Sequence, residues 1–259
     1  MHPVAAKPRD DDWDRHWRDY AESAASNPAQ AYRRRLVLRL LASSGDGIPA
    51  RVLDIGSGTG DLAAEIRNAF PTAELLGLDV SAAAVEHAAR KVPAATFLQR
   101  DLVSGSEPDP AHRGWATHAV CSEVLEHVED PEALLANARS YLAPDCRLIV
   151  TVPGGPMSAF DRHIGHRRHF TAKSMRSLLE HAGFVVERST RAGFPFFNLY
   201  RLILLLRGER LVDDVARGAG GRPARVAMRI FGLLFRLNLT RSPWGWQVLA
   251  AAHFRGRQS

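Results

Sequence analysis

The spacing of apolar residues changes twice along the chain and divides it into three parts. Before residue 42 the spacing is helical, with Trp13, Trp17 and Tyr20 on one helix face, and Asn27-Pro28 separates two helices. From residue 51 to residue 189, short apolar runs alternate with helical stretches. After residue 193 the pattern is helical again, until a strand-like run closes the chain at 246–254.

The middle part predicts a parallel sheet with helices on both faces, because its strands and helices alternate. Strands are expected at 51–55, 74–79, 95–99, 115–122, 147–153 and 184–189. Helices are expected at 61–70, 82–91, 131–142 and 172–182, with a loop over 154–171. The fold class is therefore α/β, with a doubly wound, mostly parallel sheet.

The outer parts are expected to cover this core. We divide the chain into an N-terminal helical cap (1–45), an α/β core (46–192), a helical insertion (193–243) and a final strand that rejoins the core (244–259). Within the insertion, helices are expected at 196–210 and 224–238, separated by a Gly-rich linker at 217–223.

Composition narrows the class of protein. Two cysteines in 259 residues are too few for a disulfide framework or a zinc cluster, and free thiols fit a reducing cytoplasm. The N-terminus has no apolar run typical of a signal peptide, and the most apolar stretch, 193–206, is short and interrupted by Arg201. We therefore expect a cytoplasmic protein. A net charge of +6 favours anionic partners or surfaces.

The strongest motif is the sequence VLDIGSGTGD at 52–61, where a strand is followed by a helix. Its glycines, Gly56, Gly58 and Gly60, allow a tight turn and close approach of a ligand to the backbone. The dinucleotide fingerprint would need glycine at position 61, which is Asp61. Asp54 precedes the turn, and a carboxylate there suits an ammonium group and repels a pyrophosphate.

Two further acidic residues follow the next two strands. Asp79 ends the second strand and can accept hydrogen bonds from both hydroxyls of a ribose. Asp101 follows the third strand, where it could bond an adenine amino group while Leu102 flanks the ring.

Together these segments resemble the class I S-adenosylmethionine (SAM)-dependent methyltransferases. The resemblance covers about 52–189 and, more loosely, the final strand. It implies SAM as cofactor and a seven-stranded sheet whose last strand is antiparallel. It also implies that Asp54 and the three glycines line the methionine end of SAM, Asp79 the ribose, and Asp101 and Leu102 the adenine. The predicted cofactor-binding set comprises Asp54, Gly56, Ser57, Gly58, Gly60, Asp79, Val80, Asp101, Leu102 and Ser122.

The fourth strand leads into Glu123, Glu126 and His127, at the edge where ligands of doubly wound folds bind. Three interpretations stay open. The residues are structural, or His127 is a general base, or the cluster holds a divalent metal. For the metal, the residues resemble the Glu-x-x-Glu-His of the small-RNA 3′-end 2′-O-methyltransferases and the ubiquinone-pathway O-methyltransferases, with His166 as the fourth ligand.

The segment 161–171 is expected at the same edge and holds three histidines and three arginines. We expect His163, His166 or His169 to contact the acceptor, and Arg167 or Arg168 to pair with an anionic group on it. The predicted catalytic residues are His127, His166 and Glu123.

These observations predict methyl transfer from SAM to an oxygen or nitrogen of a small, hydrophobic or aromatic acceptor. The alternatives are an RNA 2′-O-methyltransferase with a Glu/Glu/His metal site, an enzyme that cyclises or cleaves SAM, and a SAM-binding protein without activity. The aromatic residues of the two segments expected to cover the site are not interleaved with Arg and Lys as in a groove that stacks bases, which argues against a nucleic-acid partner. The apolar region 194–240, flanked by arginines, suits peripheral membrane contact or a homodimer interface.

Overall fold

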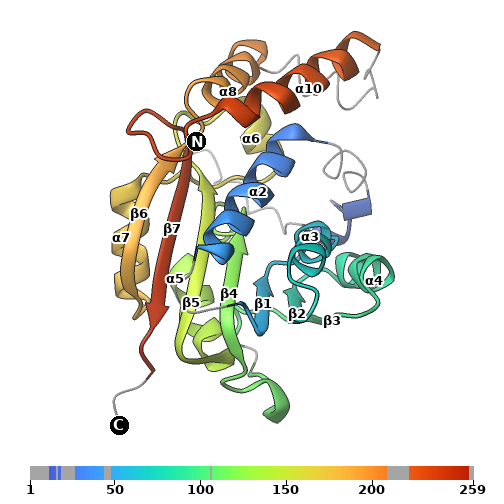
Figure 1. Ribbon diagram of the computed structural model, residues 1–259, viewed down its shortest axis with the longest axis vertical. Coiled ribbons are helices and arrows are strands. Elements are labelled where there is room, and N and C mark those ends of the chain that lie inside the picture. The colour runs from blue at the N-terminus through green and yellow to red at the C-terminus, as the bar shows by residue number, and fades with distance from the viewer. Residues whose placement is uncertain are drawn as a thin grey trace, which may run out of the picture.

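A seven-stranded sheet forms the centre of the protein (Figure 1). The computed structural model describes residues 12–15, 17–18, 27–43, 48–105, 107–208 and 222–256. The strands are β1 (Arg51–Ile55), β2 (Glu74–Asp79), β3 (Thr96–Gln99), β4 (Ala116–Ser122), β5 (Leu142–Pro153), β6 (Val185–Ala192) and β7 (Gln247–Phe254). Their order is β3-β2-β1-β4-β5-β7-β6, and only β7 runs antiparallel to its neighbours. The predicted fold class is confirmed.

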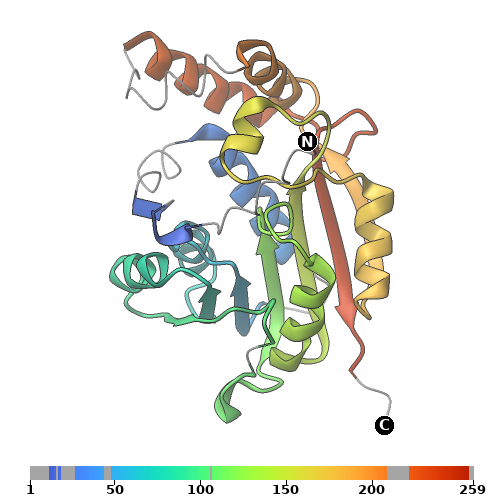
Figure 2. The same ribbon diagram turned by 180° about the vertical axis from the view of Figure 1, so that it is seen from behind.

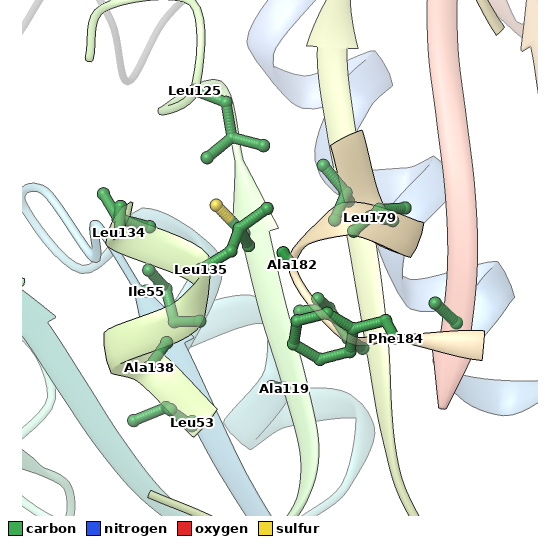
Figure 3. Packing of buried hydrophobic residues seen from close by; sticks show 14 of the residues in the cluster. Leu53, Ile55, Ala119, Leu125, Leu134, Leu135, Ala138, Leu179, Ala182 and Phe184 are labelled. Carbon is green, nitrogen blue, oxygen red and sulfur yellow. The ribbon is translucent and has the colours of Figure 1, made fainter. Parts of the chain in front are cut away.

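Helices cover both faces of this sheet (Figures 1 and 2). One face carries α2 (Pro28–Ala42), α3 (Asp61–Ala69) and α4 (Ala82–Lys91), whose apolar residues form one core with the strands. The other face carries α5 (Pro131–Ala138) and α7 (Ala172–His181). Figure 3 shows Leu134 and Leu135 of α5 packed toward Ile55 of β1. Strands buried on both faces explain the continuous apolar runs of the sequence.

Two further helices, α8 (Phe196–Arg207) and α10 (Arg222–Leu234), lie beyond the carboxyl edge of the sheet (Figure 1). An aromatic cluster of Tyr32, Phe197, Tyr200 and Phe235 joins them to α2. None of the helices in the described ranges combines the length and the apolar character needed to cross a bilayer.

Several boundaries differ from the sequence prediction. The expected loop at 154–171 contains a short helix, α6 (Ala159–His163), because Ser158 and Asp161 cap its first turn reciprocally. The helix expected to reach residue 142 ends at Ala138, and β5 already begins at Leu142. Residues 13–15 and 17–18 are helical, as expected. Tyr20 and most of the linker at 217–223 lie outside the described residues.

Candidate functional site

A cavity of about 480 Å³ lies beyond the carboxyl ends of β1, β2 and β4. The chain order of the strands reverses between β1 and β4, and such a switch point is where doubly wound sheets bind ligands. The glycine turn and the ends of β2 and β3 line one end of the cavity. Segment 122–129, α6 and the inner face of α8 line the other.

The glycine turn has the backbone that its sequence predicts. Gly56, Gly58 and Gly60 all have positive φ, at 71°, 51° and 78°. The N–H groups of Gly56 and Ser57 donate to the carbonyl of Leu78, which ties the turn to β2. A Cβ atom on Gly58 would lie 2.8 Å from the indole of Trp17. Gly56, Ser57 and Gly58 line the cavity, whereas Gly60 is the N-cap residue of α3.

Asp79 holds the glycine turn from the end of β2. Its Oδ2 accepts the N–H of Gly58 at 2.8 Å, and its Oδ1 accepts the N–H of Ser81 at 2.9 Å. Burial raises the pKa of Asp79, and these hydrogen bonds oppose the rise. A carboxylate can accept about four hydrogen bonds, so Asp79 keeps acceptor capacity for ligand hydroxyls.

Asp54 is a buried carboxylate whose Oδ2 has no hydrogen-bond partner. Burial and the charge of Asp79 raise its pKa to about 7. An unpartnered buried acceptor is costly, and a cationic ligand in the cavity would relieve the cost. The wall position of Asp54 therefore fits the ammonium group of the methionine moiety of SAM.

The remaining predicted cofactor residues, Val80, Asp101, Leu102 and Ser122, all line the cavity. Asp101 accepts hydrogen bonds from the backbone N–H of Val103 and from the hydroxyl of Ser104, so it also shapes its own turn. Trp17, which the sequence suggested only as part of a cover, lies against the glycine turn.

At the other end of the cavity, Glu126, His127 and His166 come together. Each offers one ligand atom, and these atoms lie within 4.8 Å of one another. The rings of His127 and His166 meet edge to face with centroids 4.6 Å apart, and Trp13 packs against His127 at 5.0 Å. Glu126 is fully buried, neither of its carboxyl oxygens has a hydrogen-bond partner among the described residues, and burial raises its pKa well above the usual value.

A chain of hydrogen bonds determines which nitrogen of His166 carries its proton. Nδ1 of His169 lies 3.0 Å from the carbonyl oxygen of Gly155, which only accepts, so this nitrogen carries a proton. In neutral His169, Nε2 is then an acceptor and takes the Nδ1–H of His166 at 3.1 Å. Burial lowers the pKa of both histidines. His166 is therefore a neutral ring with a lone pair on Nε2.

Glu123 lies outside the Glu126–His127–His166 cluster, although it lines the same cavity. Its carboxylate pairs with Arg33 of α2 at 2.9 Å and accepts from Gln247 of β7 at 2.8 Å and from Thr151 at 3.1 Å. Its backbone has φ 58°, a conformation that non-glycine residues rarely adopt. The structure thus brings together three of the four predicted metal ligands and leaves Glu123 paired elsewhere.

A buried ion pair that the sequence analysis missed supports the histidine segment. Both carboxyl oxygens of Asp161 accept from Arg201 of α8, at 2.7 and 2.8 Å, and the backbone and hydroxyl of Ser158 also donate to it. These partners hold the pKa of Asp161 well below its usual range. The pair fastens α8 to α6 beside the cavity.

The arginines of this segment bond backbone carbonyls. Arg167 Nε donates to the carbonyl of His127, and Arg168 donates to that of Glu129, each at 2.8 Å. They therefore hold the 126–129 segment against the 161–171 segment. His163 is exposed and lies outside the cavity wall, whereas His166 and Arg167 line it.

Comparison with known proteins agrees with this geometry. A family model described as a methyltransferase domain matches residues 20–189. The trans-aconitate 2-methyltransferase of Methylobacterium nodulans is 27% identical over 207 residues, which are 74% of this chain and 76% of that protein.

Two solved structures have a similar fold. A chain of the complex between the Haloferax volcanii Trm112 methyltransferase activator and its methyltransferase partner aligns with a TM-score of 0.62 at 16% identity, over 96% of this chain and 100% of that one. Phosphoethanolamine N-methyltransferase 2 of Haemonchus contortus, solved with S-adenosylhomocysteine, aligns with a TM-score of 0.57 at 16% identity, over 86% of this chain and 52% of that one.

Proposed function

The chain belongs to the class I SAM-dependent methyltransferase family, and from this premise we propose that it transfers a methyl group from SAM to an oxygen or nitrogen of a small, largely apolar acceptor. The observation that carries the proposal is the cavity with two chemically different ends. One end has backbone N–H groups and two buried carboxylates, Asp54 and Asp79. The other has aromatic and aliphatic walls beside Glu126, His127 and His166.

The first end suits SAM residue by residue. Asp54 faces the methionine ammonium, Asp79 the ribose hydroxyls, and Asp101 with Leu102 the adenine. SAM supplies a methyl group on a positively charged sulfur, which makes it a good electrophile. Ser57, Gly58 and Val80 fix the cofactor through shape and backbone contacts, and Ser122 lies between the two ends.

The second end suits an apolar acceptor. Phe160, Ile164, Tyr200 and Leu204 line it together with Trp13. Methyl transfer is an in-line displacement, in which the acceptor lone pair forms the new bond to carbon while the carbon–sulfur electrons return to sulfur. The enzyme mainly has to align the acceptor and exclude water. The trans-aconitate 2-methyltransferase relative, by its name, also acts on a small molecule.

His127 and His166 are the side chains placed to handle the acceptor proton. The Nε2 lone pair of His166 accepts a hydrogen bond from the acceptor O–H or N–H and orients it. His127, which is half-buried and lines the cavity, takes the proton as the methyl group arrives. Glu123 contributes by fastening α2 to the site through Arg33.

The carboxyl oxygens of Glu126, which have no hydrogen-bond partner among the described residues, favour a second interpretation of the Glu126–His127–His166 cluster, as a site for a divalent metal. Two imidazoles and one carboxylate form a donor set that binds first-row divalent metals, and both proposed ligand histidines can be neutral. Such a metal would hold an acceptor hydroxyl and lower its pKa. Glu123, which the sequence analysis counts among the four metal ligands, is instead bonded to Arg33 and Gln247.

Titration calorimetry with SAM and with S-adenosylhomocysteine tests the cofactor assignment. We expect micromolar binding that Asp79→Ala abolishes and that Glu74→Gln, on the exposed start of β2, leaves unchanged. Absence of binding to either ligand would refute the proposal. Incubation with methyl-labelled SAM and an acceptor panel, with and without Mg²⁺ or Mn²⁺, then separates methyl transfer from cyclisation or cleavage of SAM, which needs no acceptor.

A further inference from the structure

The outer faces of α8 and α10 expose an unusual amount of apolar surface. On α8, Leu199, Leu202, Ile203 and Leu206 recur at the spacing of one helix face, and all are exposed. On α10 and the turn that follows it, Val226, Ile230, Leu233 and Leu237 form a second exposed stripe. Leu206, Leu233 and Leu237 each keep more than 60% of their surface accessible.

Among the residues that the structure describes, the packing of α8 and α10 uses other faces of these helices. The opposite face of α8 carries Phe197 and Tyr200, and the opposite face of α10 leads to Phe231 and Phe235, which together form the aromatic cluster with α2. Each helix thus has one apolar face inside the protein and another outside it. Exposed contiguous apolar surface of this kind marks an interaction site.

The charge of the same region is one-sided. The continuous segment 193–246 contains nine arginines, three acidic residues (all between 209 and 214) and no Lys, so its charge of +6 equals that of the whole chain; 193–208 and 222–246 themselves contain seven arginines and no acidic residue. Of these, Arg201 is buried and pairs with the carboxylate of Asp161. Arg229, Arg236 and Arg241 are exposed. Burial lowers the pKa of Arg35, and the positive charge of nearby Arg236 lowers it further.

An exposed tryptophan extends this surface. Trp244 is 63% exposed and lies beside the start of α8, where its ring contacts Phe194 and its carbonyl accepts from Asn198. Tryptophan favours the boundary between lipid headgroups and acyl chains. Aliphatic stripes, flanking arginines and a boundary tryptophan are the features of helices that lie in the plane of a membrane surface.

We propose that the outer faces of α8 and α10 dock this enzyme on an anionic lipid bilayer. The aliphatic side chains of the two stripes enter the headgroup region, and the arginines pair with lipid phosphates. A second copy of the chain fits this surface poorly, because a symmetric contact would bring together the arginine-rich faces of α8 and α10, which carry no acidic residue of their own. RNA could pair its phosphates with the arginines, but it would leave the eight exposed aliphatic side chains without an apolar partner.

Docking at this face places the bilayer next to the acceptor end of the cavity. Tyr200 and Leu204 of α8 line the cavity, while Leu199, Leu202 and Leu206 of the same helix face outward. One helix therefore separates the membrane from the site.

Co-sedimentation with vesicles tests the proposal independently of any acceptor or of turnover. The full chain is mixed with vesicles of phosphatidylcholine alone, or of equimolar phosphatidylcholine and phosphatidylglycerol. We expect binding to the anionic vesicles that weakens with added salt, and much weaker binding to the neutral ones.

Matched variants locate the contact. Ile230→Asp should weaken binding by about thirtyfold, because it removes one inserted side chain. Arg229→Gln should weaken it by about fivefold. Ile48→Asp and Arg255→Gln change the same residue types at the opposite end of the sheet and should bind like the wild type. Thermal melting of each variant checks folding, which substitution of exposed side chains should preserve.

Three results would overturn the proposal. The wild type sediments with neither vesicle, or it binds both vesicles equally, or Ile230→Asp binds as tightly as Ile48→Asp. Light scattering distinguishes a further case. If the wild type does not bind vesicles but forms a dimer, and Ile230→Asp dissociates that dimer, this face binds a second copy of the chain.

Discussion

Asp54 makes opposite contributions to folding and to ligand binding, which allows a sharp test of the cofactor end. Its side chain is 3% exposed, and its Oδ2 has no hydrogen-bond partner. Burial and the charge of Asp79 raise its pKa from 3.8 to about 7. Each unit of difference between the folded and unfolded pKa corresponds to about 1.4 kcal/mol, so ionised Asp54 lowers the free energy of unfolding by up to about 4 kcal/mol.

The direction of the pH dependence follows from proton binding. Between pH 4 and pH 7 the folded state retains the Asp54 proton while the unfolded state has released it. The contribution of this group to stability therefore falls as pH rises through that window and is constant above it. Asp54→Asn removes the ionisation. The variant should be more stable than the wild type at pH 8, by up to about 4 kcal/mol, and the difference should approach zero near pH 4.

Binding of SAM should change in the other direction. The asparagine cannot pair with the methionine ammonium, and loss of a hydrogen bond between charged groups costs about 1.5–3 kcal/mol, or about tenfold to a hundredfold in affinity. SAM thus pairs with the buried carboxylate of Asp54 in the wild type, and the variant, which lacks this charge, binds SAM poorly. Raising the pH from 5 to 7, which stays below the usual pKa of an α-amino group, should strengthen SAM binding by the wild type more than by the variant.

Urea unfolding at pH 5 and pH 8, without ligand, measures the first effect, and calorimetry with SAM measures the second. Glu74→Gln is the control, because it neutralises an exposed carboxylate far from the cavity. The reasoning fails if Asp54→Asn is less stable than the wild type at pH 8. It also fails if the variant is stabilised equally at both pH values, or if it binds SAM with unchanged affinity.

Three further predictions follow from the geometry. Gly58→Ala should weaken SAM binding about tenfold by calorimetry, because φ is 51° and the new methyl group would lie too close to Trp17. Gly105→Ala, at φ 82° with its new methyl group at an ordinary 3.8 Å from Nδ2 of Asn137, should leave binding unchanged; equal losses would contradict the assignment. Arg201→Leu should lower the free energy of unfolding by about 3–5 kcal/mol, because it leaves the buried carboxylate of Asp161 without its partner. The double variant with Asp161→Asn should recover part of the lost stability. An unchanged melting temperature would show that the pair is not buried in solution. His169→Phe should reduce kcat and shift its pH profile with little change in KM for SAM, because His166 loses the partner that fixes its tautomer; an unchanged profile would remove His169 from the mechanism.

The fold could be predicted because its determinants are local. Strands buried on both faces have continuous apolar sequences, and the helices between them have helical spacing, so each element is visible in its own residues. The glycine turn and Asp79 are equally local, since a strand end followed by a helix places them at one edge. The short helix α6 escaped prediction because five residues are too few for periodicity, and its cap, Ser158 with Asp161, resembles an ordinary turn in sequence.

The acceptor end depends on contacts between residues far apart in the chain. Asp161 is satisfied by Arg201, forty residues later, and no spacing rule connects them. The sequence predicts that Arg167 or Arg168 pairs with an anionic group on the acceptor; in the folded chain both also bond backbone carbonyls, those of His127 and Glu129, which no pattern in the sequence indicates. A flexible, charged side chain can reach many partners, and only the assembled fold determines which one it meets.

Glu123 and Glu126 show how strongly contacts between residues far apart in the chain limit inference from sequence. The two carboxylates are three residues apart in a segment that resembles a metal-binding motif, and both reach the same cavity. Gln247, 124 residues away, and Arg33 of α2 satisfy Glu123, which makes it a structural link between β7, α2 and the site. Glu126 is buried without a hydrogen-bond partner beside two histidines. A buried carboxyl in that state must stay protonated or meet a cation or a donor, so the chemistry of the acceptor end depends on what Glu126 binds.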